Sequence, residues 1–166
     1  MSSALGPIDD AWRALSGVPD PEIPVLTVVD LGIVRSVEFS EGVGLSVGIT
    51  PTYSGCPATA VIREHIATAL RAAGFASVSV HEVLSPAWTT DWMSEEGRRK
   101  LQAYGMVPPP RPRSRRSDES ADDAPPLCAR CASRATERLS EFGSTPCKAL
   151  YRCTSCLEPF ERFKCI

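Results

Sequence analysis

The chain has 166 residues, a formal net charge of −2 and seven cysteines. This length allows one ordinary domain plus a small module, and the absence of a basic surplus disfavours nonspecific binding to nucleic acid. No apolar run approaches a membrane span and the N-terminus has no secretory-signal pattern, so we expect a cytoplasmic protein whose cysteines serve metal or thiol chemistry.

Residues 1–106 predict a small α+β domain in which a sheet carries helices. The expected order is helix, strand, strand, helix, strand, helix, over residues 8–17, 33–39, 43–49, 57–74, 76–83 and 94–105. Alternation of apolar residues predicts the strands, and apolar residues at helical spacing predict the helices. Three prolines within residues 18–24 forbid a regular element there and indicate a stiff, extended loop.

The turn over residues 50–57 (TPTYSGCP) joins the second predicted strand to the second predicted helix. Pro57 suits the first helical position because it has no N–H to leave unpaired. Cys56 therefore lies at or beside the helix N-cap, where free N–H groups and the helix dipole favour a thiolate. This placement indicates an accessible, reactive cysteine; the alternative is a small buried residue that packs the turn.

Residues 107–126 are rich in proline and charge and predict a linker, extended at its start and then disordered. Residues 127–166 contain two C-x2-C pairs, Cys128 with Cys131 and Cys153 with Cys156, separated by 21 residues. Two such pairs can close a metal tetrahedron and supply the folding energy that a forty-residue module lacks.

The sequence therefore predicts a C-terminal zinc-ribbon-like module with a structural zinc ion. Two further cysteines, Cys147 and Cys165, are alternative ligands. With them, the tail thiols suit an iron–sulfur cluster as a second possibility.

The first domain resembles the MIP18/DUF59 family of iron–sulfur assembly factors. The motifs that carry the resemblance are DPEIP at residues 20–24, DLGIV at 30–34 and TPTYSGCP at 50–57. The resemblance implies that Cys56 is the reactive or cluster-handling residue, and it places the acidic loop residues of the family on Glu22 and Asp30. From the residues themselves, Glu22 is equally well a solvated loop carboxylate, and Asp30 equally well closes a turn.

Outside the linker, the whole chain resembles one branch of that family, the D subunits of bacterial phenylacetyl-CoA epoxidase (phenylacetate-CoA oxygenase) complexes. The motifs that carry this resemblance lie at residues 86–92, 96–101, 141–145, 147–153 and 158–160. It implies an accessory role in maturing the iron centres of that complex during aerobic phenylacetate degradation. The implied partners are the di-iron oxygenase or the iron–sulfur flavin reductase, and the implied cargo is iron or a transient iron–sulfur cluster.

The residues agree with a non-catalytic role and indicate no catalytic residue. A di-iron site needs Glu-x-x-His pairs, but the chain has only two histidines, and Ile62 stands three residues before His65. No Gly-x-Gly-x-x-Gly loop is present for a flavin or nicotinamide cofactor. A purely structural docking protein of the complex is an alternative, and a cysteine-dependent enzyme is a weaker one, because His65 lies roughly 13 Å along the helix from Cys56.

Overall fold

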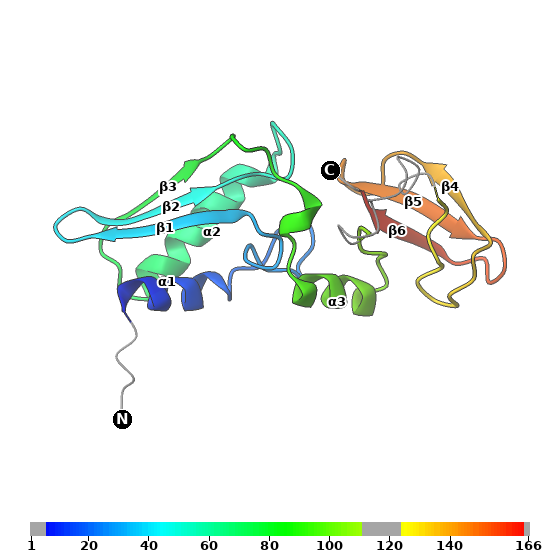
Figure 1. The fold of residues 1–166 in the computed structure, drawn as a ribbon, viewed down its shortest axis with the longest axis horizontal. Helices are drawn as coiled ribbons and strands as arrows, with labels where there is room; N and C mark the ends of the chain where they lie inside the picture. The colour runs from blue at the N-terminus through cyan, green and yellow to red at the C-terminus, as the bar shows by residue number, and fades with distance from the viewer. Residues whose placement is uncertain (1–5, 111–123, 165–166) are drawn as a thin grey trace, which may run out of the picture. The chain divides into compact units, whose positions relative to one another are not determined.

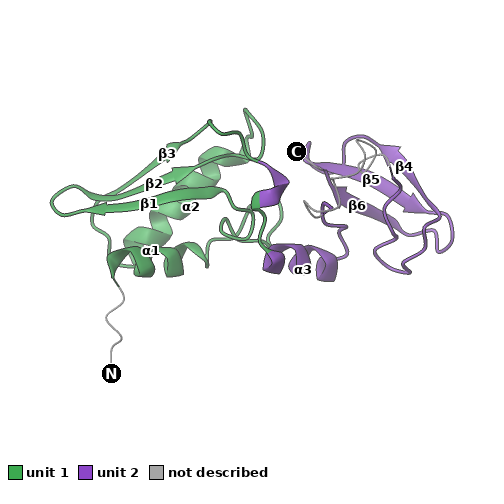
Figure 2. Cartoon of the chain, viewed as in Figure 1, with its two compact units in different colours: residues 1–88, 92–94 green, residues 89–91, 95–166 purple. Residues whose placement is uncertain are grey.

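The computed structural model describes residues 6–110 and 124–164 (Figure 1). The chain forms two compact units, residues 1–88 with 92–94 and residues 89–91 with 95–166 (Figure 2). The predicted domain boundary after residue 106 instead places the third helix in the first domain. That boundary, and the independent folding of residues 127–166, stay predictions.

The first unit contains the first five predicted elements in the expected order. They are α1 (Pro7–Leu15), β1 (Val34–Ser40), β2 (Gly44–Ile49), α2 (Ala58–Ala72) and β3 (Val78–Glu82). The strands form one sheet in the order β1-β2-β3, with β1 antiparallel and β3 parallel to the central β2. Helices α1 and α2 lie together on one face of this sheet (Figure 1), so the mixed helix-and-sheet fold is confirmed.

The core of the first unit follows from the two apolar periodicities. Every second residue of β2, Leu45, Val47 and Ile49, is buried. Helix α2 buries residues four apart, Ile62, Ile66 and Leu70. Burial of these two faces against each other fixes the helix over the sheet, and each fully buried aliphatic side chain contributes about 1.5–3 kcal/mol.

The proline-rich loop is a compact turn, and the prediction of an extended loop was wrong. The N–H of Asp20 donates to the carbonyl of Leu26 at 2.8 Å, and Pro19 forms an isolated bridge with Thr27. The buried carboxylate of Asp20 accepts the N–H groups of Glu22 at 2.9 Å and Ile23 at 2.7 Å. A short acidic side chain that bonds its own following backbone folds such a loop, even where the prolines exclude a helix or strand.

The second unit combines one helix with a small antiparallel sheet. Its elements are α3 (Glu95–Tyr104), β4 (Thr136–Ser140), β5 (Lys148–Cys153) and β6 (Pro159–Phe163), with the strands in the order β4-β5-β6. The short 3-10 helix η1 (Thr90–Trp92) precedes α3 in the chain. Of the helices in the described ranges, none is both long and apolar enough to cross a membrane.

Both ends of the predicted linker are bonded to the second unit. Val107 exchanges backbone hydrogen bonds with β6, donating to Glu161 at 3.0 Å and accepting from Phe163 at 2.9 Å. The carbonyl of Pro109 accepts a 2.6 Å bond from the buried Arg98, and that of Pro126 accepts a 2.7 Å bond from Thr136. The prediction of a linker over residues 107–126 was therefore too wide at both ends, and its disordered part falls mainly on residues 111–123, outside the described residues.

Gly32 is expected to tolerate a side chain poorly. Its φ is +68°, and a Cβ there would overlap the carbonyl group of Trp92. Gly42 is the matched control, because its φ is +79° and a Cβ there would meet no atom within 4 Å. Gly42→Ala is expected to cost about 1–2 kcal/mol of unfolding free energy, from the left-handed backbone alone. Gly32→Ala should cost clearly more in urea unfolding, and equal losses would contradict the close approach.

Candidate metal centre and the Cys56 turn

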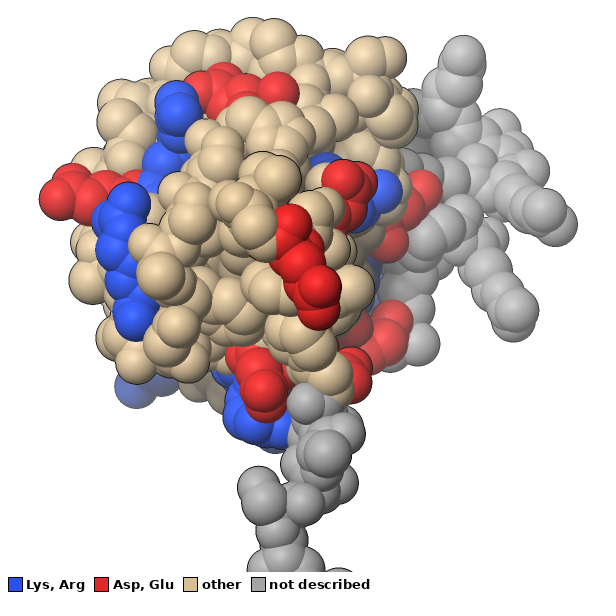
Figure 3. Space-filling model, turned by 90° about the vertical axis from the view of Figure 1, so that its left-hand side faces the viewer, with Lys and Arg blue, Asp and Glu red and all other residues tan. Residues whose placement is uncertain are grey.

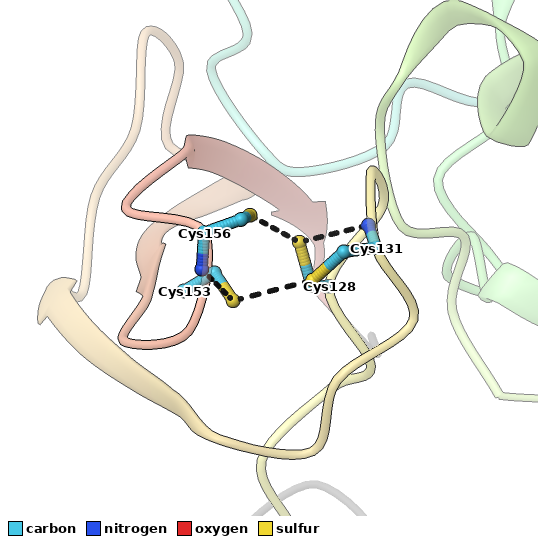
Figure 4. Close-up of side chains that lie close together, drawn as sticks. All are labelled: Cys128, Cys131, Cys153 and Cys156. Atoms are coloured by element: carbon cyan, nitrogen blue, oxygen red, sulfur yellow. Dashed lines mark hydrogen bonds between the residues drawn. The ribbon is translucent and has the colours of Figure 1, made fainter.

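Four cysteines of the second unit come together in one cluster. The Sγ atoms of Cys128, Cys131, Cys153 and Cys156 all lie within 4.8 Å of one another (Figure 4). The distance between Cys128 and Cys156 is 3.7 Å, and that between Cys131 and Cys153 is 3.6 Å. Metal–sulfur bonds of about 2.3 Å in a tetrahedron give sulfur–sulfur edges of about 3.8 Å, so the cluster has the size of a zinc tetrathiolate.

Each C-x2-C pair forms a tight turn that aims backbone N–H groups at its first sulfur. Cys128 accepts from the N–H groups of Arg130 at 3.4 Å and Cys131 at 3.5 Å, and Cys153 accepts from that of Cys156 at 3.4 Å. The residue after each pair has a left-handed backbone, with φ of 58° at Ala132 and 63° at Leu157. Both turns therefore have the same chain path, and both orient N–H dipoles to stabilise thiolates.

The thiols of the cluster differ in how readily they ionise. The N–H of Cys156 is the main cause that lowers the pKa of Cys153 to about 6. For Cys131, the N–H of Ser133 acts to lower the pKa, but the thiols of Cys156 and Cys153 and burial outweigh it and raise the pKa to about 12. Mutual repulsion thus opposes ionisation of all four thiols at once, and a divalent cation at their centre would remove this obstacle.

The cluster is also part of the hydrophobic core of the sheet. The buried members of this core cluster are Cys128, Ala149, Tyr151, Cys153 and Phe160, and Val107, Ala129 and Cys156 pack against it partly buried. Tyr151 and Phe160 stack with their ring centroids 5.8 Å apart. A core this small is expected to need the metal for stability.

The structure describes only one of the two alternative ligands, Cys147 and Cys165. Cys147 is buried outside the cluster, with its Sγ 3.0 Å from the hydroxyl of Thr145. Cys165 lies outside the described residues. The geometry therefore favours the four cysteines of the two C-x2-C pairs as a closed structural site without an open coordination position.

Cys56 lies on a turn that is fixed at the ends of the three strands of the first sheet. The buried Thr50 begins this turn, and its N–H donates to the carbonyl of Ile33 at 2.8 Å while its hydroxyl donates to that of Val83 at 2.6 Å. Cys56 is half-buried, and its carbonyl accepts the N–H of Thr59 in the first turn of α2 at 3.1 Å. The N-cap is Pro57, one residue later than Cys56, and no side chain caps the helix there.

The two acidic residues named with Cys56 belong to the loops of the first unit. Asp30 is buried, and its carboxylate accepts the N–H of Thr27 at 3.0 Å and the hydroxyl of Ser94 at 3.2 Å. Glu22 is half-buried in the turn that Asp20 closes. Within residues 6–110 and 124–164, the only metal-sized group of cysteine, histidine or acidic side chains is the cluster of the second unit, so the structure does not bring Cys56, Glu22 and Asp30 together in such a group.

No histidine of the described chain is hydrogen-bonded to Cys56. His65 is exposed on α2, and Nδ1 of His81 lies 3.5 Å from the hydroxyl of Ser46 on the sheet. The geometry thus gives no support to a cysteine nucleophile that is activated by a neighbouring base.

Sequence reasoning did not identify several charged residues that the structure buries, among them Arg98 and Lys148. Arg98 donates to the carbonyls of Pro109 at 2.6 Å and Thr90 at 2.7 Å. Lys148, also buried, lies 3.5 Å from the carboxylate of Glu161. The strand pattern gives no signal for Lys148, because it stands on the face of β5 opposite to the buried Ala149, Tyr151 and Cys153, where a polar residue is expected.

Replacement of one sulfur should separate the metal ligands from the other cysteines. Cys153→Ser is expected to abolish tight binding of one metal ion and to unfold the sheet of the second unit, since the remaining core is too small. The thermal transition of the first unit should persist. Cys147→Ser is the matched control, a buried cysteine of the same sheet that should keep its metal. Metal retained by Cys153→Ser, or lost by Cys147→Ser, would show that the ligand set is different.

Comparisons with known proteins agree with this two-part organisation. Residues 8–81 match the family model "Iron-sulfur cluster assembly protein", and residues 111–164 match "PaaD zinc beta ribbon domain". A crystal structure of a DUF59 domain from Bacillus anthracis covers 57% of this chain and 91% of its own, with a TM-score of 0.53 and 26% identity. A Porphyromonas gingivalis protein described as an Fe-S protein maturation auxiliary factor is 35% identical over 94 residues, 56% of this chain and 89% of that one.

A relative from Escherichia coli K12 matches nearly the whole chain. It is described as the D subunit of 1,2-phenylacetyl-CoA epoxidase, and it is 52% identical over 165 residues, 96% of this chain and 93% of that one. The match includes both the turn with Cys56 and the four-cysteine module. The chain therefore belongs to the family of phenylacetyl-CoA epoxidase D subunits, which joins an iron–sulfur cluster assembly domain to a zinc ribbon.

Proposed function

We propose that this protein is a non-catalytic accessory subunit that matures the phenylacetyl-CoA epoxidase complex of aerobic phenylacetate degradation. In this role it assists the delivery of iron, or of an iron–sulfur cluster, to another subunit. The observation that carries the proposal is the end-to-end similarity to a protein described as the D subunit of the epoxidase. The match of the first unit to iron–sulfur assembly proteins supports the kind of cargo.

Cys56 is the residue that we propose handles the iron or the cluster. Its thiol is half-exposed on a turn that Thr50 anchors to the sheet, so it combines access with a fixed position. Glu22 is proposed to supply a further contact to the cargo or the partner. Asp30 is better suited to holding its loop, because its two oxygens already accept bonds from Thr27 and Ser94.

The second unit is proposed to bind zinc through Cys128, Cys131, Cys153 and Cys156 and to dock on the partner. A closed tetrathiolate holds a fold but leaves no position for a substrate, which suits a structural ion. Protein is the expected partner rather than nucleic acid. On the face seen in Figure 3, where the first unit faces the viewer, basic and acidic side chains are interspersed, whereas phosphate binding needs a continuous basic surface.

A scaffold protein without metal chemistry is the second candidate. It is favoured by one observation, namely that Cys56, Glu22 and Asp30 form no metal-sized group among the described residues. The two candidates differ in a single respect: a scaffold needs the surface of the protein, whereas a maturation factor also needs the thiol of Cys56.

Substitution of Cys56 should therefore reduce the iron content of the client without unfolding this chain. Cys56→Ala should keep the unfolding free energy within about 1 kcal/mol of the wild-type value, because the residue lies on a half-exposed turn. Cys56→Ser removes thiolate chemistry but keeps a small polar side chain, and it should fail in the same way. The measurement is iron content and activity of the epoxidase matured with each variant, with Cys147→Ser as a control cysteine of the same chain.

Each outcome separates the two candidates. Iron-deficient epoxidase with both Cys56 variants, and normal enzyme with Cys147→Ser, supports maturation through the thiol. Full iron and full activity with Cys56→Ala would leave only the scaffold role. Full iron and full activity when the entire chain is omitted would refute both.

A further inference from the structure

The end of β4 and the loop that follows it expose two large apolar side chains within four residues. Phe142 is 60% exposed and Leu139 is 49% exposed. Leu139 stands at a register shift between Arg138 and Ser140, where β4 carries one residue more than its partner β5. Such bulges re-aim a side chain, and here the result is an apolar residue in solvent rather than in the core.

The backbone on both sides of Phe142 is held in place by buried or paired groups. The N–H of Phe142 donates to the hydroxyl of Ser140 at 3.2 Å. On the other side, the carboxylate of Glu161 accepts two hydrogen bonds from Ser144, one from its N–H at 2.5 Å and one from its hydroxyl at 3.2 Å. The buried Lys148 lies 3.5 Å from the same carboxylate, and these bonds together lower the pKa of Glu161 even though burial opposes this.

Gly143 is part of the same arrangement. A Cβ at this position would lie 2.5 Å from Oε1 of Glu161 and 3.2 Å from Cβ of Lys148. The loop thus packs closely on the Lys148–Glu161 pair, and a Cβ at Gly143 would require the Glu161 carboxylate to shift. A partly buried ion pair is weak evidence for stability, but the bonds of Glu161 to Ser144 hold the loop that presents Phe142.

Positively charged side chains lie near the ring of Phe142. Nζ of Lys164 lies 4.4 Å from the ring centroid and donates to the carbonyl of Glu141 at 3.2 Å. The carboxylate of Glu141 is 2.9 Å from Arg138 and 4.0 Å from Lys164. Two cations therefore share one anion, which leaves a positive charge beside an exposed aromatic ring.

We propose that Leu139 and Phe142 form a docking surface that inserts into an apolar pocket of another protein, with carboxylates at the edge of that pocket. A rigid, exposed aromatic side chain is a typical anchor of a protein interface, because little entropy is lost when it binds. The adjacent positive charge selects an acidic partner surface. This inference rests on the proposed function, since the expected partner is another component of the epoxidase.

The test measures dissociation constants between the full-length, metal-loaded chain and each purified candidate partner, the di-iron oxygenase and the reductase, by titration calorimetry. Phe142→Ala should weaken binding to one of them by about thirtyfold or more, as expected for an interface anchor. Glu161→Gln keeps Phe142 but frees its loop, and it should weaken binding less. Leu84→Ala is the matched control, an equally exposed apolar residue of the first unit (62%) whose loss should leave binding unchanged. Metal content and thermal unfolding verify that each variant is folded.

Wild-type affinity in Phe142→Ala would overturn this docking surface and leave the maturation role intact. If the wild-type chain binds neither the oxygenase nor the reductase, the docking surface is also overturned. The maturation role is tested separately, by the iron content of the epoxidase. If the wild-type chain instead sediments as a dimer that Phe142→Ala dissociates, the surface joins two copies of this chain and the proposed partner is wrong. Weaker wild-type binding at high salt is expected, because the attraction to carboxylates is screened.

Discussion

The four-sulfur cluster is the interaction on which the second unit depends most. Two of its cysteines, Cys128 and Cys153, are at the same time buried members of a small hydrophobic cluster with Ala149, Tyr151 and Phe160. A sheet of three short strands with such a core has too little apolar burial to offset the entropy of ordering the chain. Metal–sulfur bonds would supply the difference and also balance four thiolates that repel one another.

In the part of the chain that the structure describes, the first unit is stabilised without a metal cluster, by the packing of apolar side chains. Its core lies between one face of the sheet and the helices α1 and α2, and it contains no cluster of metal-ligating side chains among the described residues. The same packing fixes the end of β2, where Thr50 ties the three strands together and the turn with Cys56 begins. We therefore propose two different roles for cysteine in the two units: a closed cluster that supports a fold, and a partly exposed Cys56 that is available for chemistry.

Local patterns were sufficient to predict the order of helices and strands up to α3 and the clustered cysteines, but not the strands β4 and β6. The period of two in β2, the helical spacing in α2 and the two C-x2-C pairs each report on residues that are close in sequence. The predictions failed where the deciding contact joins distant residues or a side chain with backbone. Asp20 folds the proline-rich loop through N–H groups that no periodicity reveals.

The linker and the site residues show the same limit. Val107 looked like linker because prolines follow it, yet its backbone pairs with β6, more than fifty residues later in the chain. Arg98 lies in the predicted helix over residues 94–105, and nothing in its helical spacing shows that it is buried and bonds two carbonyl groups. The arrangement of Cys56, Glu22 and Asp30 was inferred from a resemblance, and spacing alone could not have shown that Asp30 is already engaged by Thr27 and Ser94.

The most direct test of this division of cysteine chemistry is metal analysis of the purified chain, combined with its absorption spectrum and the rate at which each cysteine is alkylated. The account predicts one equivalent of zinc, no visible absorption bands, and Cys56 reacting well before the four clustered cysteines, which the metal protects. Iron with the visible bands of an iron–sulfur cluster in the second unit, or clustered cysteines that react as fast as Cys56, would contradict it.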